Sequence, residues 1–154
     1  MEIREVKPEG AVLEELIELS RLWEQENSTW GYRTNGPENL EGRRVFVARE
    51  DGRIIGYLFG KMAQSKDAQS IMPEGTGYFF VEELFVLPER RSQGVGGALF
   101  RFAEDTLRGE TEYIRLGTAT KNWKAILHFY LEEMGMTFWN AGLFKKISEN
   151  GETV

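Results

Sequence analysis

The segment of residues 85–100, FVLPERRSQGVGGALF, constrains the fold more than any other part of the chain. An apolar strand leads into a basic turn, which is followed by a glycine-rich turn and a helix. Gly94, Gly96 and Gly97 allow a ligand to approach the backbone closely, and the amides of residues 93–97 are free at the start of the helix. Free amides at a helix N-terminus attract anions. The segment therefore predicts a phosphate-binding turn.

The spacing of Arg91, Gly94 and Gly96 excludes two common phosphate-binding motifs. A dinucleotide-binding motif requires a third glycine at position 99, where this chain has Leu99. A P-loop requires GKS or GKT after its first glycine, and the sequence contains neither. The remaining pattern, RxxGxG after an apolar strand, resembles motif A of the GNAT superfamily of acetyl-CoA-dependent N-acetyltransferases. In that family these amides hold the pyrophosphate of coenzyme A.

Length and composition favour one soluble domain spanning residues 1–154. A chain of 154 residues with 41% hydrophobic residues can form one core of its own. The net charge of -6 argues against nucleic acid as a partner. With no cysteine, no apolar signal region and no membrane-length apolar run, we expect a cytoplasmic protein without a membrane partner. Because His128 is the only histidine, we also expect no metal site.

The expected order of elements extends the resemblance over nearly the whole chain. Hydrophobic periodicity and turn residues predict strands at 2–7, 44–50, 54–63, 76–88 and 113–119, with one or two closing strands within 136–147. Helices are expected at 11–26, from Pro37, from the glycines to Arg108, and at 122–134. The fold class is therefore α/β (α+β): a GNAT-like mixed, mostly antiparallel sheet of about six to seven strands flanked by four helices.

The resemblance assigns the residues that contact acetyl-CoA. The glycine turn is expected to hold the pyrophosphate by its amides first and by side-chain charge second. In the family, the pantetheine arm lies beside the end of the preceding strand, and a main-chain amide near Phe85 or Val86 would face the thioester oxygen. Asn122 would bond the pantetheine or cap its own helix. The full expected set is Leu84, Phe85, Val86, Arg91, Ser92, Gln93, Gly94, Val95, Gly96, Gly97 and Asn122.

Glu82 and Glu83 are the candidate general bases. They precede the strand end assigned to the pantetheine, where a carboxylate could accept the proton of the acceptor amine, usually through water. Successive strand residues face opposite sides, so we expect at most one of them in a given cleft and a structural role for the other. The segment resembles that of polyamine N-acetyltransferases, in which paired acids attend the substrate amine. The resemblance favours a cationic amine.

Tyr130 is the candidate general acid for the departing thiolate. Residues 122–134 resemble motif B of the family, in which the tyrosine that protonates the thiolate stands seven residues after the asparagine. Here Phe129 stands at that position and Tyr130 follows it. A regular helix would turn Tyr130 by about 100° from the family position, whereas an extension or a bulge could restore it. Otherwise water, Tyr78 or Tyr57 would supply the proton.

These residues predict an N-acetyltransferase that moves an acetyl group from acetyl-CoA directly to a primary amine of a small cationic molecule or a peptide. Trp30 and Tyr32, in a polar loop after the first helix, are expected to form a wall of the substrate site. The alternative is a non-catalytic acyl-CoA-binding or sensor domain with the same phosphate loop. The identity of the acceptor, the acyl chain length and the formation of a homodimer through the closing strands are left open.

Overall fold

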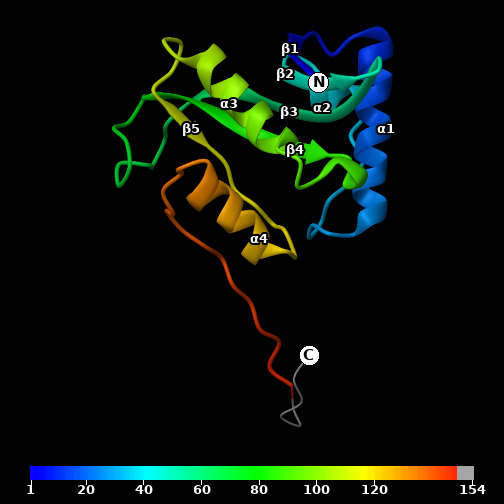
Figure 1. Ribbon diagram of the computed structural model, residues 1–154. Helices are drawn as coiled ribbons and strands as arrows, with labels where there is room; N and C mark the ends of the chain where they lie inside the picture. The colour runs from blue at the N-terminus through cyan, green and yellow to red at the C-terminus, as the bar shows by residue number, and fades with distance from the viewer. Residues whose placement is uncertain (149–154) are drawn as a thin grey trace.

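The computed structural model describes residues 1–148 and forms one sheet with helices on both faces (Figure 1). The elements are β1 (Glu2–Val6), α1 (Gly10–Glu26), α2 (Pro37–Leu40), β2 (Arg44–Glu50), β3 (Arg53–Gln64), β4 (Gly77–Val86), the 3-10 turn η1 (Pro88–Arg90), α3 (Val95–Leu107), β5 (Tyr113–Arg115), α4 (Trp123–Leu127) and the π-helical turn η2 (His128–Glu133). The five strands lie in sequence order, and only the β4–β5 pair is parallel. The mixed, mostly antiparallel fold with four α-helices is confirmed.

The sheet is buried on both faces because α1 covers one face and α3 covers the other. Trp23 of α1 stacks on Phe85 of β4 with ring centroids 5.6 Å apart. On the opposite face, Phe102 of α3 meets Phe46 of β2 edge-on at 6.1 Å. The central strands β2 and β3 are therefore nearly continuous runs of buried apolar residues and do not alternate between apolar and polar residues. None of the helices in residues 1–148 is long and apolar enough to cross a membrane.

A β-bulge in β4 determines how the two candidate carboxylates are presented. Phe59 of β3 pairs with Glu83 and Gly60 pairs with Val81, so Glu82 is an additional residue without a partner on β3. Gly60 is required opposite the bulge, since an added Cβ would lie only 2.0 Å from the carbonyl oxygen of Phe80. The strict alternation expected across Glu82 and Glu83 is broken at this point.

The closing strands predicted within residues 136–147 are not formed. The segment is extended, but it pairs with no strand of the described chain, and it projects away from the body beyond α4 (Figure 1). The sheet of residues 1–148 accordingly has five strands and not six to seven. The alternation of apolar residues predicts a strand, but a strand also needs an edge to pair with. The strand expected at 113–119 likewise ends at Arg115.

Candidate active site

A row of free backbone amides lies at the N-terminus of α3. Ser92 and Gly94 both adopt left-handed backbone conformations, with φ of 62° and 83°. The N–H groups of residues 92–97 donate to no other described residue, and the first bond of the helix runs from Ala98 N to Gly94 O at 3.0 Å. Alternating left-handed residues followed by a helix N-terminus form a concave anion site. The predicted phosphate turn thus has the backbone geometry that such a site needs.

Gly96 keeps this row of amides open to close approach. An added Cβ at Gly96 would lie 3.6 Å from Phe129 Cζ and 3.7 Å from Val86 Cγ2, at ordinary contact distances. The backbone of Gly96 therefore faces both the end of β4 and the η2 turn. A methyl group there would fit against these two side chains.

β4 has an open edge next to the amide row. β4 and β5 pair only from Tyr78↔Tyr113 to Phe80↔Arg115, so the β5 side of β4 has no strand partner in the described chain beyond Phe80. Leu84, Phe85 and Val86, which the sequence assigns to the pantetheine arm, lie on this part of β4. An extended ligand placed along this edge would meet backbone groups that no strand pairs, as an added strand does, except that the Val86 carbonyl is already bonded by Arg91.

Arg91 fastens this edge to α1. Its Nε donates to the carbonyl oxygen of Val86 at 2.9 Å, and its Nη2 donates to Glu26 Oε1 at 2.9 Å. The guanidinium also lies over the ring of Phe85, with Cζ 5.4 Å from the centroid. Glu26 compensates part of the Arg91 charge, so an anion at the turn would depend mainly on the amides. The side-chain amide of Gln93 bonds to the Glu89 carbonyl at 3.3 Å.

Glu83 is the centre of a partly buried hydrogen-bond network. Its Oε1 accepts from the hydroxyls of Tyr32 and Tyr57, each at 2.8 Å, and Asn35 Nδ2 donates to both carboxylate oxygens at 3.1 Å. The Tyr32 hydroxyl also bonds to Ser20 Oγ at 2.7 Å. Burial raises the pKa of Glu83, although the hydrogen bonds from Tyr57, Tyr32 and Asn35 oppose the shift. Burial likewise raises the pKa of both tyrosines, which keeps them protonated.

Glu82 has a different electrostatic environment. It forms an ion pair with Arg43, in which Arg43 Nε contacts Glu82 Oε1 and Arg43 Nη2 lies 3.3 Å from Glu82 Oε2. The bulge thus directs both carboxylates toward the segment between α1 and β2, which supplies Tyr32, Asn35 and Arg43. A cation neutralises Glu82, whereas Glu83 is bound by neutral donors only. This difference favours Glu83 as the residue able to take up a proton.

Tyr130 lies in the π-helical turn η2. The bond from Met134 N to Phe129 O, at 2.9 Å, spans five residues and widens the helix at Phe129 and Tyr130. Of the alternatives for the displaced tyrosine, the structure thus has the bulged helix. Tyr130 packs 6.2 Å from the ring of Phe100 and 5.0 Å from that of Phe129, and burial raises its pKa to about 12. Phe129, and not Tyr130, is the residue that faces Gly96.

A comparison with known protein families agrees with the amide row, the open strand edge and the carboxylate network described above. The model described as Acetyltransferase (GNAT) family matches residues 12–136, which is most of the chain. The chain belongs to the GNAT acetyltransferase family. The family expected from the RxxGxG turn and the order of elements is confirmed, and the protein is an acyltransferase.

Solved structures show how widely this fold is used. The GNAT chain is similar to a putative acetyltransferase from Agrobacterium tumefaciens str. C58 (21% identity, TM-score 0.68, 96% of this chain and 100% of that chain). It is also similar to an aminoglycoside 6'-N-acetyltransferase from Acinetobacter haemolyticus (20%, 0.64, 96% and 100%) and a ribosomal-protein-alanine N-acetyltransferase from Brucella melitensis (14%, 0.64, 95% and 100%). No curated protein sequence matches significantly. At these identities the likeness shows the fold, and the two named enzymes act on unrelated acceptors.

The remaining predicted residues of the GNAT chain lie around this centre. Tyr32 joins the Glu83 network and stacks on Trp23 with centroids 4.2 Å apart. Trp30 is instead 57% exposed, and the Lys121 ammonium lies 4.6 Å from its ring centroid. Asn122 is exposed at the start of α4 and makes no side-chain capping bond, so its amide is not used by the helix.

Three residues of the site were not predicted from the sequence. Asn35 and Ser20 complete the Glu83 network, and Arg43 neutralises Glu82. Each contacts a residue 15 to 48 positions away, as in Asn35–Ser20 and Asn35–Glu83, so spacing gives no signal for them. Glu83 and Phe85 are two positions apart on β4 and so lie on one face, and Phe85 pairs with Tyr57 of β3. Tyr57 therefore shares the face of Glu83, but this follows only once the register of β3 on β4 is known.

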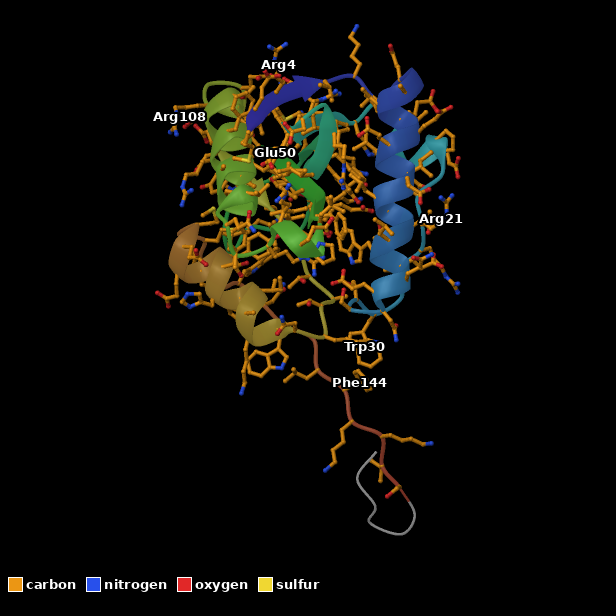
Figure 2. The ribbon with its side chains drawn as sticks, turned by 45° about the vertical axis from the view of Figure 1, so that its right-hand side comes forward. Arg4, Arg21, Trp30, Glu50, Arg108 and Phe144 are labelled. Atoms are coloured by element: carbon orange, nitrogen blue, oxygen red, sulfur yellow. The ribbon has the colours of Figure 1, made fainter. Side chains whose placement is uncertain are left out.

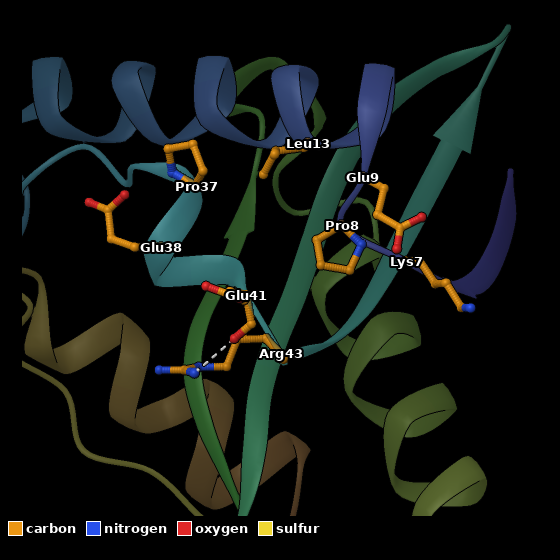
Figure 3. Close-up of a pocket in the computed structure, with 9 residues that line it drawn as sticks. Lys7, Pro8, Glu9, Leu13, Pro37, Glu38, Glu41 and Arg43 are labelled. Carbon is orange, nitrogen blue, oxygen red and sulfur yellow. Dashed lines mark hydrogen bonds between the residues drawn. The ribbon is translucent and has the colours of Figure 1, made fainter.

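A cavity of about 690 Å³ lies apart from the amide row (Figure 3). It is open to solvent and is lined by the loop before α1, the first turns of α1 and the segment from α2 to β2; Arg43 is the residue that it shares with the Glu82 ion pair. Its lining includes Lys7, Glu9, Glu38 and Glu41. Within residues 1–148, no three His, Asp or Glu side chains are grouped to hold a metal ion.

Proposed function

We propose that this GNAT protein transfers an acetyl group from acetyl-CoA directly to a primary amine held beside Glu83. The observation that carries the proposal is the order of three features along β4 and the helix α3 that follows it. β4 presents Glu83 at its bulge, then an open edge, and then the free amides at the start of α3. Glu83 precedes Val86 by three residues, which is about 10 Å along an extended strand. A proton acceptor therefore lies at one end of the open edge of β4, and the anion site follows the other end.

The residues present fit coenzyme A. The amides of residues 92–97 suit a pyrophosphate because they donate to no described residue and stand at a helix N-terminus. Leu84, Phe85 and Val86 suit the arm because their strand edge is open. Asn122 has a free side-chain amide at the start of α4 and can donate to or accept from the same arm. Bound acetyl-CoA supplies the thioester carbon that the amine attacks.

Glu83 accepts the proton that the amine loses. Three hydrogen bonds reach its Oε1 and one reaches Oε2, so Oε2 retains capacity for a water or an ammonium group. The raised pKa of Glu83 makes it a better base than an exposed glutamate. The amide C–N bond forms as the C–S bond breaks, and the amine proton passes to Glu83 directly or through water. The sulfur takes its proton from the Tyr130 hydroxyl, which its raised pKa keeps protonated at neutral pH.

A backbone amide at Phe85 or Val86 stabilises the developing negative charge on the carbonyl oxygen. This role needs no side chain. Leu87 N donates to Ile55 O, so the backbone of Phe85 pairs with Tyr57 of β3, and the N–H of Val86 is the one that faces the open edge. The acceptor is expected to be a cation before it loses its proton, because Glu83 is a partly buried carboxylate with no cationic partner of its own among residues 1–148. Tyr32 and Trp30 would border this acceptor.

Two measurements test the proposal. Calorimetric titration of acetyl-CoA into the protein should give saturable binding in the micromolar range. A thiol-reactive dye should then report coenzyme A release when primary amines are added, with no background from the protein because the chain contains no cysteine. Absence of binding by folded protein would contradict the assigned cofactor site. Binding without thiol release across diamines, aminoglycosides and peptide N-termini would contradict the acceptor class.

A further inference from the structure

Both oxygens of the Glu82 carboxylate are bound by one arginine. Arg43 Nε contacts Glu82 Oε1 and Arg43 Nη2 lies 3.3 Å from Glu82 Oε2, which is the two-point contact that a planar guanidinium makes with a carboxylate. The remaining nitrogen, Nη1, donates to the carbonyl oxygen of Glu41 at 3.2 Å (Figure 3). All three guanidinium nitrogens are therefore used, and they hold the side chain in one orientation.

The β-bulge is what brings Glu82 to Arg43. Arg44, the next residue after Arg43, pairs with Gly60 of β3, and Gly60 pairs with Val81, the residue before Glu82. Arg43 and Glu82 therefore flank β3 at this position, and their side chains meet across it. The two side chains are only 24% and 23% exposed, so water and salt screen this ion pair less than one on the open surface.

Glu83, the neighbouring acid, has no such partner. Among residues 1–148 no cationic side chain pairs with it, and its hydrogen bonds come from the neutral side chains of Tyr32, Tyr57 and Asn35. Burial, and to a lesser degree the charge of Glu82, raises the pKa of Glu83, so the two carboxylates are close enough to interact. The acceptor site thus has two adjacent acids, of which only Glu83 can pair with an ammonium group while Arg43 stays in place.

We propose that Arg43 restricts the acceptor to molecules with a single ammonium group. This inference rests on the proposed acetyl transfer beside Glu83. An acceptor with one amine pairs with Glu83 and leaves the Arg43–Glu82 pair intact. The second ammonium group of a short diamine would instead meet a carboxylate that is already paired and a guanidinium of like charge. Arg43 does not touch the reacting atoms, and it determines specificity by keeping Glu82 paired.

Two acceptors of equal length, butylamine and 1,4-diaminobutane, test the inference. The wild-type protein should use butylamine at least as well as the diamine, as judged by kcat/KM from coenzyme A release. The ratio of the two kcat/KM values removes any change in Glu83 itself, because both amines lose their proton to the same group. A wild-type protein that prefers the diamine would overturn the proposal.

Replacing Arg43 should reverse this preference. Arg43→Gln frees Glu82 and should raise the ratio of diamine to butylamine kcat/KM by about 10-fold, because one repulsive charge is removed and one ion pair is gained. Combining Arg43→Gln with Glu82→Gln removes the freed carboxylate and should return the ratio to its wild-type value. An unchanged ratio in Arg43→Gln, or a raised ratio that persists in the double variant, would overturn the proposal.

Two other arginines control for the loss of a positive charge as such. Arg44 is about as buried as Arg43, but it pairs with Glu5 of β1. Arg21 projects from α1 away from the sheet, where it pairs with Glu18 (Figure 2). Arg44→Gln and Arg21→Gln should both leave the ratio unchanged. A raised ratio in either variant would overturn a role specific to Arg43.

Amine binding separates this inference from the proposed reaction. Calorimetric titration of each amine into protein mixed with coenzyme A gives the relative Kd of the two amines without turnover. A relative Kd that shifts toward the diamine in Arg43→Gln, with no thiol release from acetyl-CoA by any variant, would support the role of Arg43 and contradict acetyl transfer. Thiol release with the relative Kd and the kcat/KM ratio both unchanged in Arg43→Gln would contradict the role of Arg43 alone.

Discussion

The substitution Gly96→Ala should separate the stability of the protein from its cofactor binding. Gly96 is the second residue of α3, and alanine is favoured over glycine in a helix by about 0.5–1 kcal/mol. The added methyl group meets Phe129 and Val86 at 3.6–3.7 Å, without overlap. The folded state should therefore gain stability, with a rise in Tm of about 1–4 °C for a domain of this size.

We expect the same methyl group to hinder the close approach of a pyrophosphate to the amides. Losing one or more hydrogen bonds to a charged pyrophosphate costs about 1.5–3 kcal/mol, so the Kd for acetyl-CoA should rise by about 10- to 150-fold. Calorimetry and thermal unfolding on one sample measure both effects. Gly77→Ala is the matched control, because its added Cβ lies 3.8 Å from Thr111 Oγ1, far along β4 from the turn. A Gly96→Ala protein with raised Tm and unchanged Kd would refute the placement of the pyrophosphate.

Three further substitutions test the catalytic centre and the bulge. Glu83→Gln should abolish the rise of kcat/KM with pH, which the raised pKa of Glu83 should place above the usual glutamate range. Because burial disfavours the charged carboxylate above that pKa, the Tm of the variant at neutral pH should be unchanged or higher than that of the wild type. A lower Tm would instead indicate a structural role for Glu83. Tyr130→Phe should lower kcat by about 10- to 10,000-fold with little change in the Kd of acetyl-CoA, and unchanged turnover would assign the proton to another group. Gly60→Ala should destabilise the fold strongly, because its Cβ would lie 2.0 Å from Phe80 O; soluble protein with wild-type Tm would contradict the requirement for glycine there.

The phosphate turn could be predicted from the sequence because its determinants are local. The positive φ of Gly94, the free amides and the following helix all arise within a few residues, and the residue types encode them directly. The displaced Tyr130 similarly raised the alternative of a bulged helix, and the structure has a π-helical turn there. Each of these predictions needed only the spacing of residues on one element.

The carboxylate network could not be predicted in the same way. Glu83 is surrounded by Tyr32, Asn35 and Tyr57, which come from a loop and from a neighbouring strand. Their convergence depends on the register of β3 on β4 and on the path of the chain after α1. The prediction of closing strands within residues 136–147 was wrong for a related reason. The alternation of apolar residues along this segment indicates one face that should be buried, but the segment itself does not specify which strand edge it would pair with.

The bulge at Glu82 connects the fold to the proposed chemistry. Without it, strict alternation would direct Glu82 and Glu83 to opposite faces of β4, and one of them would enter the core beneath α3. The additional residue turns both toward the segment between α1 and β2, where Arg43 neutralises Glu82 and neutral donors bind Glu83. The ion pair thereby keeps a second charged group from competing for the amine proton. Gly60, which has no part in the chemistry, is therefore required for a single proton acceptor at the centre of the site.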